Sequence, residues 1–148
     1  MDPSFESLTG LCVSYLWFGD HTALYLELGE LKAGKPRKDG TAGNPLGQIT
    51  VYAGYDWRIE KTASIYSNKA SANDRHQQAA AEVQQSTITY ASAVGRLPEL
   101  EIGFSNGLWL TTFAQNSGQP QWTVSFNTVG KGHLCVARGR LCFDRSDA

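Results

Sequence analysis

The sequence predicts a mostly β protein of the α+β class. We expect one curled antiparallel sheet, half-barrel or sandwich-like, of about eight short strands with a single helix near residues 71–85. The main observation is that apolar and polar residues alternate in many short segments, which is the period of a half-buried strand. In addition, turn-forming Gly, Asn and Asp residues separate these segments, and only one stretch combines good helix formers with no strand alternation.

Length and composition fit a single domain over residues 1–148. A chain of this length buries about two-thirds of its unfolded surface, so it needs no metal or disulfide to fold. The net charge of -1 argues against a nucleic-acid binder, and no run approaches the ~20 apolar residues that span a membrane. The first residues lack the pattern of a secretory signal, and three cysteines without a C-x-x-C pair fit a reducing compartment. We therefore expect a cytoplasmic protein.

The first element is a predicted hairpin. Residues 11–18 are rich in aromatic and apolar side chains and stop at a Gly-Asp-His turn. In residues 23–28, Leu24, Leu26 and Leu28 share one face, which is strand periodicity.

A basic segment follows the hairpin. Residues 32–48 are rich in Gly and Pro, lack apolar periodicity, and contain Lys32, Lys35, Arg37 and Lys38. We predict a long flexible loop, and the near-zero total charge favours a solvated loop over a nucleic-acid contact. After it, residues 49–60 alternate as a long half-buried strand with a bend at Gly54.

The one predicted helix covers residues 71–85. Ser71 is the expected N-cap, with Asp74 three residues later, and good helix formers continue to Gln85. The apolar stripe consists mostly of alanines, so we expect a surface helix with one edge against the sheet.

The strongest local pattern is a hairpin over residues 99–113. A three-residue loop with Gly107 in the left-handed conformation pairs Ile102 with Leu110 and gives one continuous apolar face. A two-residue loop would mix the faces. The preferred register leaves Trp109 on the opposite face, where a partner could bind it.

Two further strands are predicted at residues 87–94 and 121–126, and a last hairpin joins residues 133–137 to 141–143. A two-residue turn there makes Cys135 face Cys142, close enough to respond to oxidation. These thiols and His133 are three soft ligands, but a fourth is missing and their neighbours are apolar. Buried structural thiols are the favoured interpretation, so we predict no metal and no cofactor.

No enzyme signature emerges from the sequence. A Gly-x-Ser-x-Gly run is missing, and the glycines of the basic segment precede no helix that could hold phosphate. We interpret His21, His76 and His133 as solvated or capping residues. The chain is predicted not to be an enzyme.

Surface residues are then the remaining candidates for function. An acidic aromatic patch would complement a basic nuclease surface. The candidate partner-binding residues are Asp20, Glu27, Glu30, Asp56, Trp57, Glu60 and Trp109. The alternative is that these acids only confer solubility.

One pattern has a family resemblance. Residues 95–110 read Gly-Arg-Leu, an alternating strand, Phe-Ser-Asn-Gly and a second strand, and a Trp strand follows at residues 121–124. These segments and the opening hairpin resemble a group of small bacterial proteins suspected to be immunity proteins, the cytoplasmic antidotes of polymorphic or contact-dependent toxins. The resemblance implies a cognate toxin domain as the partner and brings no catalytic residues.

The leading hypothesis is thus an immunity protein that occludes the active site of its toxin. The alternative is a small-ligand binder with a cavity formed by Tyr15, Trp17, Tyr25 and Trp57. Under either hypothesis we expect no nucleic-acid partner and no membrane association, and the sequence does not predict the oligomeric state.

Overall fold

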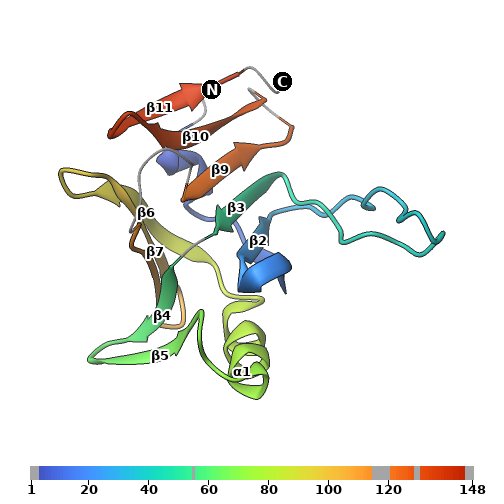
Figure 1. Ribbon diagram of the computed structural model, residues 1–148, viewed down its shortest axis with the longest axis horizontal. Coiled ribbons are helices and arrows are strands. Elements are labelled where there is room, and N and C mark those ends of the chain that lie inside the picture. Colours follow the sequence, from blue (N-terminus) through green and yellow to red (C-terminus); the bar gives the residue numbers. More distant parts are fainter. Residues whose placement is uncertain (1–3, 55, 115–120, 129–130, 146–148) are drawn as a thin grey trace.

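The computed structural model describes residues 4–54, 56–114, 121–128 and 131–145. Its eleven strands form two antiparallel sheets (Figure 1). The six-stranded sheet has the order β1 (Val13–Phe18), β2 (Leu24–Leu28), β3 (Ile49–Ala53), β9 (Trp122–Phe126), β10 (Gly132–Ala137) and β11 (Arg140–Asp144). The five-stranded sheet has the order β5 (Ser64–Asn68), β4 (Trp57–Lys61), β8 (Trp109–Thr112), β7 (Glu99–Phe104) and β6 (Ile88–Val94).

The mostly β class is confirmed, but the expectation of one curled sheet with about eight strands is wrong. The long strand predicted over residues 49–60 is two strands in different sheets, because the chain leaves β3 after Ala53 and enters β4 at Trp57. Strand β5 was not predicted, since it lies at a sheet edge and its burial does not alternate. Among the described strands, neither sheet closes into a barrel.

The hydrophobic core draws on both sheets. In the six-stranded sheet, Leu26, Val51 and Val124 are neighbours in register and are at most 1% exposed. In the five-stranded sheet, Ile102 and Leu110 are paired and fully buried. All five side chains belong to one cluster, so each strand turns alternate residues towards a shared interior.

The predicted helix is α1 (Asn73–Val83), and two short 3-10 helices, η1 (Phe5–Leu8) and η2 (Asp20–Thr22), accompany it. Ser71 is not its N-cap as predicted: Ala72 takes that position, while the Ser71 hydroxyl accepts a hydrogen bond of 3.0 Å from the Asn68 N–H. One side of α1 is buried, and the helix contacts β5 and β1. None of the described helices is long and apolar enough to cross a membrane.

Two predicted hairpin registers are confirmed. Ile102 pairs with Leu110 in β7–β8, and Gly107 has the left-handed conformation (φ 87°). In β10–β11, Cys135 faces Cys142. Both registers follow from local turn chemistry, which explains why the sequence predicts them.

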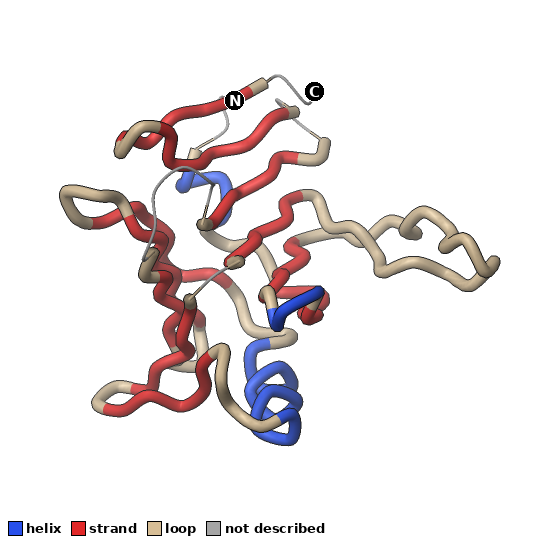
Figure 2. The backbone as a smooth tube through the Cα atoms, in the orientation of Figure 1, coloured by secondary structure: helices blue, strands red, loops and turns tan. Residues whose placement is uncertain are grey.

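The basic segment of residues 32–48 is a loop that projects from the six-stranded sheet, and we call it the arm (Figure 2). Lys32 and Leu46 exchange backbone hydrogen bonds of 2.8 and 2.9 Å at its base. Further out, Gly34 and Gly43 allow the outgoing and returning segments of the arm to approach closely, because a Cβ at either position would collide with the opposite backbone.

Candidate functional site

The structure does not gather the predicted partner-binding residues into one patch. Asp20 and Glu30 are exposed near the first hairpin, Glu27 and Trp57 are buried, and Asp56 is partly exposed just before β4. Glu60 and Trp109 are the pair that the fold brings together, since they face each other between β4 and β8.

The expectation that Glu27 lies at the surface is wrong. Its side chain is 1% exposed, although it points to the outer face of the six-stranded sheet. The base of the arm lies against it: the Gly47 N–H donates to Oε1 at 3.0 Å, and the Thr50 hydroxyl donates to the same oxygen. The Trp17 indole N–H donates to Oε2 at 2.9 Å. Glu27 is therefore a buried structural carboxylate that joins the arm to the sheet.

Trp57 is likewise not a surface anchor. It is 0% exposed, and its indole N–H donates a hydrogen bond of 3.0 Å to the Thr22 carbonyl oxygen. Its ring lies 6.0 Å from Phe18 and 5.6 Å from His76, measured between ring centroids. Trp57 thus contributes to the core between β1, β4 and α1.

His76 is buried, whereas the sequence predicts a solvated or capping residue. It is 6% exposed, and its Nε2 lies 2.8 Å from the Asn68 carbonyl oxygen. The ring also stacks on Phe18 at 4.9 Å. From the sequence, a histidine in a largely polar helix is expected to be exposed. In the fold, Phe18 of β1 and Asn68 at the end of β5 cover it.

Trp109 lies on the outer face of the five-stranded sheet and is partly exposed. Gly103 is its cross-strand neighbour, and a Cβ there would lie 3.0 Å from the six-membered ring of the indole. On the other side of Gly103, Tyr90 lies 5.6 Å from Trp109 between ring centroids. The missing side chain at Gly103 therefore makes room for an aromatic pair on this face.

Further apolar and charged side chains surround this pair. We call the whole group the aromatic face; its members are Arg58, Glu60, Ile65, Tyr90, Glu99, Glu101, Trp109 and Phe113. The exposed fractions of Ile65, Tyr90 and Phe113 are 56%, 40% and 37%. The Arg58 guanidinium forms an ion pair with Glu60 and lies 5.7 Å over the Phe113 ring. Ile65 could not be assigned to this face from the sequence, because the pairing of β4 with β8 is non-local. Tyr90 is hidden by the register shift between Ile88 and Tyr90 in β6, whereas the alternation of β8 could have placed Phe113 beside Trp109.

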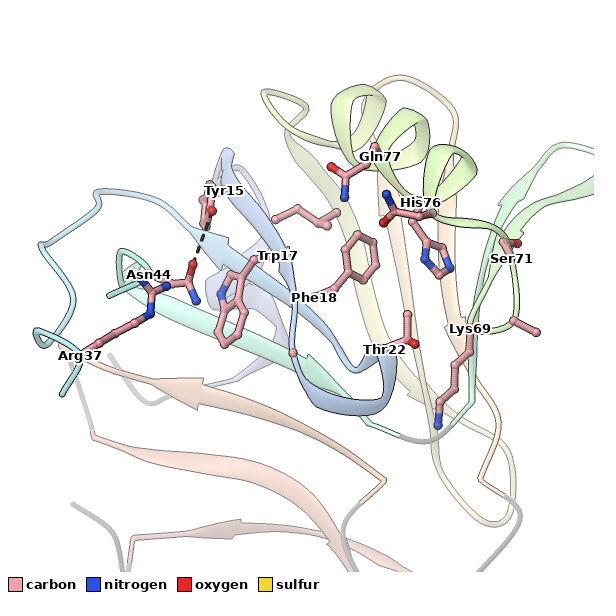
Figure 3. A pocket seen from close by; sticks show the side chains of 14 residues that line it. Tyr15, Trp17, Phe18, Thr22, Arg37, Asn44, Lys69, Ser71, His76 and Gln77 are labelled. Atoms are coloured by element: carbon pink, nitrogen blue, oxygen red, sulfur yellow. Dashed lines mark hydrogen bonds between the residues drawn. The ribbon is translucent and has the colours of Figure 1, made fainter. Parts of the chain in front are cut away.

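A cleft of about 840 Å³ opens beside the edge strand β1, between the arm and α1 (Figure 3). Trp17 and Phe18 lie between Arg37 on the arm side and Lys69 on the α1 side. Its described lining contains no Asp or Glu side chain, so the cleft favours anionic groups.

The aromatic residues expected to form a ligand cavity do not line one space. Tyr15 and Trp17 line the cleft, whereas Trp57 is fully buried in the core. Tyr25 is stacked on Trp17, with ring centroids 3.9 Å apart. The predicted four-residue cavity is therefore wrong, and an open cleft takes its place.

His133, Cys135 and Cys142 share the outer face of β10 and β11. The His133 Nε2 lies 3.9 Å from a carboxylate oxygen of Asp144, while the two thiols face each other. The described residues form no cluster of three or more His, Cys, Asp or Glu side chains that could hold a metal ion.

Two side chains on the outer face of the six-stranded sheet, Tyr25 and Cys135, have a higher pKa in the folded protein than in the unfolded chain. Burial and the neighbouring Tyr52 raise the pKa of Tyr25 above its ordinary value of 10.0. Burial and the Cys142 thiol raise the pKa of Cys135 from 9.0 to about 11.

These shifts predict a loss of stability at alkaline pH. The unfolded chain loses the Cys135 and Tyr25 protons first, so the contribution is fully present below about pH 9 and is lost as pH rises to about 11. Urea unfolding measured across this range checks it. The decline should be smaller in Cys135→Ala and Tyr25→Phe than in the parent protein, and equal slopes in all three would contradict the assignment.

Comparisons with protein-family models, curated proteins and solved structures found no match for this chain.

Proposed function

We propose that this chain is an immunity protein that binds a cognate bacterial toxin domain through the aromatic face. The observation that carries the proposal is the partly exposed Trp109, which lies on Gly103 beside Tyr90 in a sheet. Tryptophan and tyrosine dominate the binding energy of protein interfaces, because they bury a large area with little loss of side-chain freedom. A strand also holds them more rigidly than a loop would.

The charge of the aromatic face supports a basic partner. Glu60, Glu99 and Glu101 contribute three carboxylates, against the single guanidinium of Arg58. Glu60 is paired with Arg58, and the Glu99 carboxylate accepts hydrogen bonds from the Thr112 hydroxyl and the Ala114 N–H, so Glu101 is the main free charge of this group. Complementary charge speeds encounter and excludes partners of the wrong sign. Toxin domains that act on nucleic acid need a basic substrate site, so the aromatic face has the charge required to cover one.

Inhibition by occlusion needs no reactive group on the inhibitor. It requires an interface of about 1,600 Å² with one or two well-packed anchors. Trp109 is the expected anchor, and Tyr90 and Phe113 are expected to exclude water around it. In this proposal the protein acts in the cytoplasm of the cell that makes the toxin.

Replacing Trp109 with alanine is expected to weaken the complex by about 2 kcal/mol, or roughly 30-fold in Kd. Co-expression with the toxin domain encoded beside the gene, followed by calorimetry of the purified complex, measures this loss. Leu141→Ala is the matched control, because Leu141 is an exposed apolar residue of the other sheet. Absence of both growth rescue and a co-purifying complex would refute the proposed function. Equal losses in the two variants would refute the assigned surface.

A second candidate function is binding of a small anionic ligand in the cleft beside β1. Its volume and the presence of Arg37 and Lys69 without an acidic side chain in the described lining support this function. A thermal-shift screen with carboxylate and phosphate metabolites tests it. We expect a hit to be lost in Arg37→Ala, and no shift across the panel would count against the candidate.

A further inference from the structure

The β10–β11 hairpin holds two thiols opposite each other. Cys135 and Cys142 are direct cross-strand partners, and their Sγ atoms lie 3.7 Å apart. We propose that small-molecule disulfides, such as oxidised glutathione, oxidise this pair to an intramolecular disulfide that locks the hairpin. The site lies on the other sheet from the aromatic face and is independent of the proposed toxin binding.

The turn between the strands fixes the register of the thiols. Arg138 and Gly139 both adopt the left-handed conformation, with φ of 54° and 76°, which a two-residue hairpin turn requires. A slip of the register by one residue would place Cys135 and Cys142 on opposite faces. The tight turn therefore keeps the two sulfur atoms together.

The observed geometry is close to that of a disulfide. Cross-strand partners have Cα atoms about 4.5–5.5 Å apart, which lies within the range that disulfides span. Rotation of the two side chains must bring the Sγ atoms from 3.7 Å to a bond length of about 2.0 Å. No change of backbone register is needed.

Access to the pair is asymmetric. Cys142 is partly exposed on the edge strand β11, whereas Cys135 is 5% exposed between β9 and β11. Arg138 in the turn and Arg140 at the start of β11 are both exposed, and their positive charge favours the approach of an anionic disulfide. Cys142 is therefore the thiol that meets the oxidant.

The chemistry takes two exchange steps. The Cys142 thiolate attacks one sulfur of oxidised glutathione, forms a mixed disulfide and releases one glutathione thiolate. The Cys135 thiol then loses its proton to solvent, and its sulfur attacks Cys142 Sγ and displaces the second glutathione. The protein dithiol loses two electrons, and the glutathione disulfide is reduced to two thiols.

The bond would tie the outermost strand to the sheet. Strand β11 pairs only with β10 among the described strands, and its Phe143 ring lies 5.9 Å from Phe126 of β9. Linking Cys135 to Cys142 would hold that aromatic contact in place when the edge strand opens.

The test uses the full chain with Cys12→Ser, which removes the third, exposed thiol. After incubation with about 1 mM oxidised glutathione, we expect the intact mass to fall by two hydrogens and both thiols to resist alkylation. Dithiothreitol should restore both thiols. We also expect oxidation to raise Tm by about 5 °C. Two alkylatable thiols, or a lasting glutathione adduct on Cys142, would refute the disulfide, and an unchanged Tm would refute the locking.

A matched variant reports on the first step separately. In Cys12→Ser with Cys135→Ser, Cys142 is reached by the oxidant but has no resolving thiol. We expect a stable adduct of one glutathionyl group on Cys142. A chain that stays unmodified would show that the oxidant does not reach Cys142, and it would overturn the mechanism.

Discussion

Replacing Trp57 with alanine is expected to lower the free energy of unfolding by about 4 kcal/mol. The side chain is fully buried and contacts Phe18 and His76, so its removal leaves a large cavity between β1, β4 and α1. The Thr22 carbonyl oxygen also loses its hydrogen-bond donor. Because domains of this size are stable by only about 5–15 kcal/mol, urea denaturation will measure the loss readily.

Trp57→Phe is the control for this prediction. It keeps an aromatic ring in the core but cannot donate to the Thr22 carbonyl oxygen, so a loss of about 1–2 kcal/mol is expected. Trp57→Ala could instead stay within about 0.5 kcal/mol of the parent in stability and bind the partner more weakly. That result would contradict the core role of Trp57 and support the partner-binding role that the sequence suggests.

Replacing Glu27 with alanine is expected to cost about 3 kcal/mol. Three donors lose their acceptor at once: the Gly47 N–H, the Thr50 hydroxyl and the Trp17 indole N–H. Buried donors without partners are expensive, and the base of the arm is left with the hydrogen bonds of Gln48 to Leu28 and Glu30. Urea denaturation measures the stability, and increased proteolysis within residues 32–48 would report the loosened arm.

Two variants make the Glu27 prediction specific. Glu27→Gln keeps the shape and one acceptor oxygen but turns an NH₂ group towards donors, so about half of the loss is expected. Glu30→Ala removes an exposed acid near the same hairpin and should change stability by less than about 0.5 kcal/mol. Equal effects of Glu27→Ala and Glu30→Ala would show that the buried network is unimportant.

The elements that could be predicted from the sequence are those set by local chemistry. The β7–β8 register follows from Gly107 and from the alternation of Ile102 and Leu110 with polar neighbours. The Cys135–Cys142 pairing follows from the short turn between them. In both hairpins, turn length and side-chain period determine which residues face each other.

The division into two sheets could not be predicted, because it depends on where one long segment changes partners. Residues 49–60 alternate throughout, yet β3 pairs with β2 and β9 while β4 pairs with β5 and β8. A period of two is the same in either sheet, so alternation carries no information about that change.

The burial of individual polar and aromatic residues could not be predicted for a similar reason. Glu27 alternates with leucines and looks solvent-facing, but the arm returns over it. Trp57 and His76 both pack against Phe18 of β1, which is distant in sequence. For the candidate site, the prediction that Trp109 lies opposite the apolar side of its hairpin is confirmed. Its neighbour Glu60 comes from β4, whose pairing with β8 is non-local. Tyr90 reaches the same face because a register shift between Ile88 and Tyr90 interrupts the alternation of β6.

Hydroxyl-radical footprinting of the protein alone and bound to the proposed toxin partner tests binding through the aromatic face, because it reports on individual side chains. We expect labelling of Tyr90, Trp109 and Phe113 to fall several-fold in the complex, while labelling of Leu141 on the other sheet is unchanged. Unchanged labelling of Trp109, with protection confined to the arm or the cleft beside β1, would contradict this expectation.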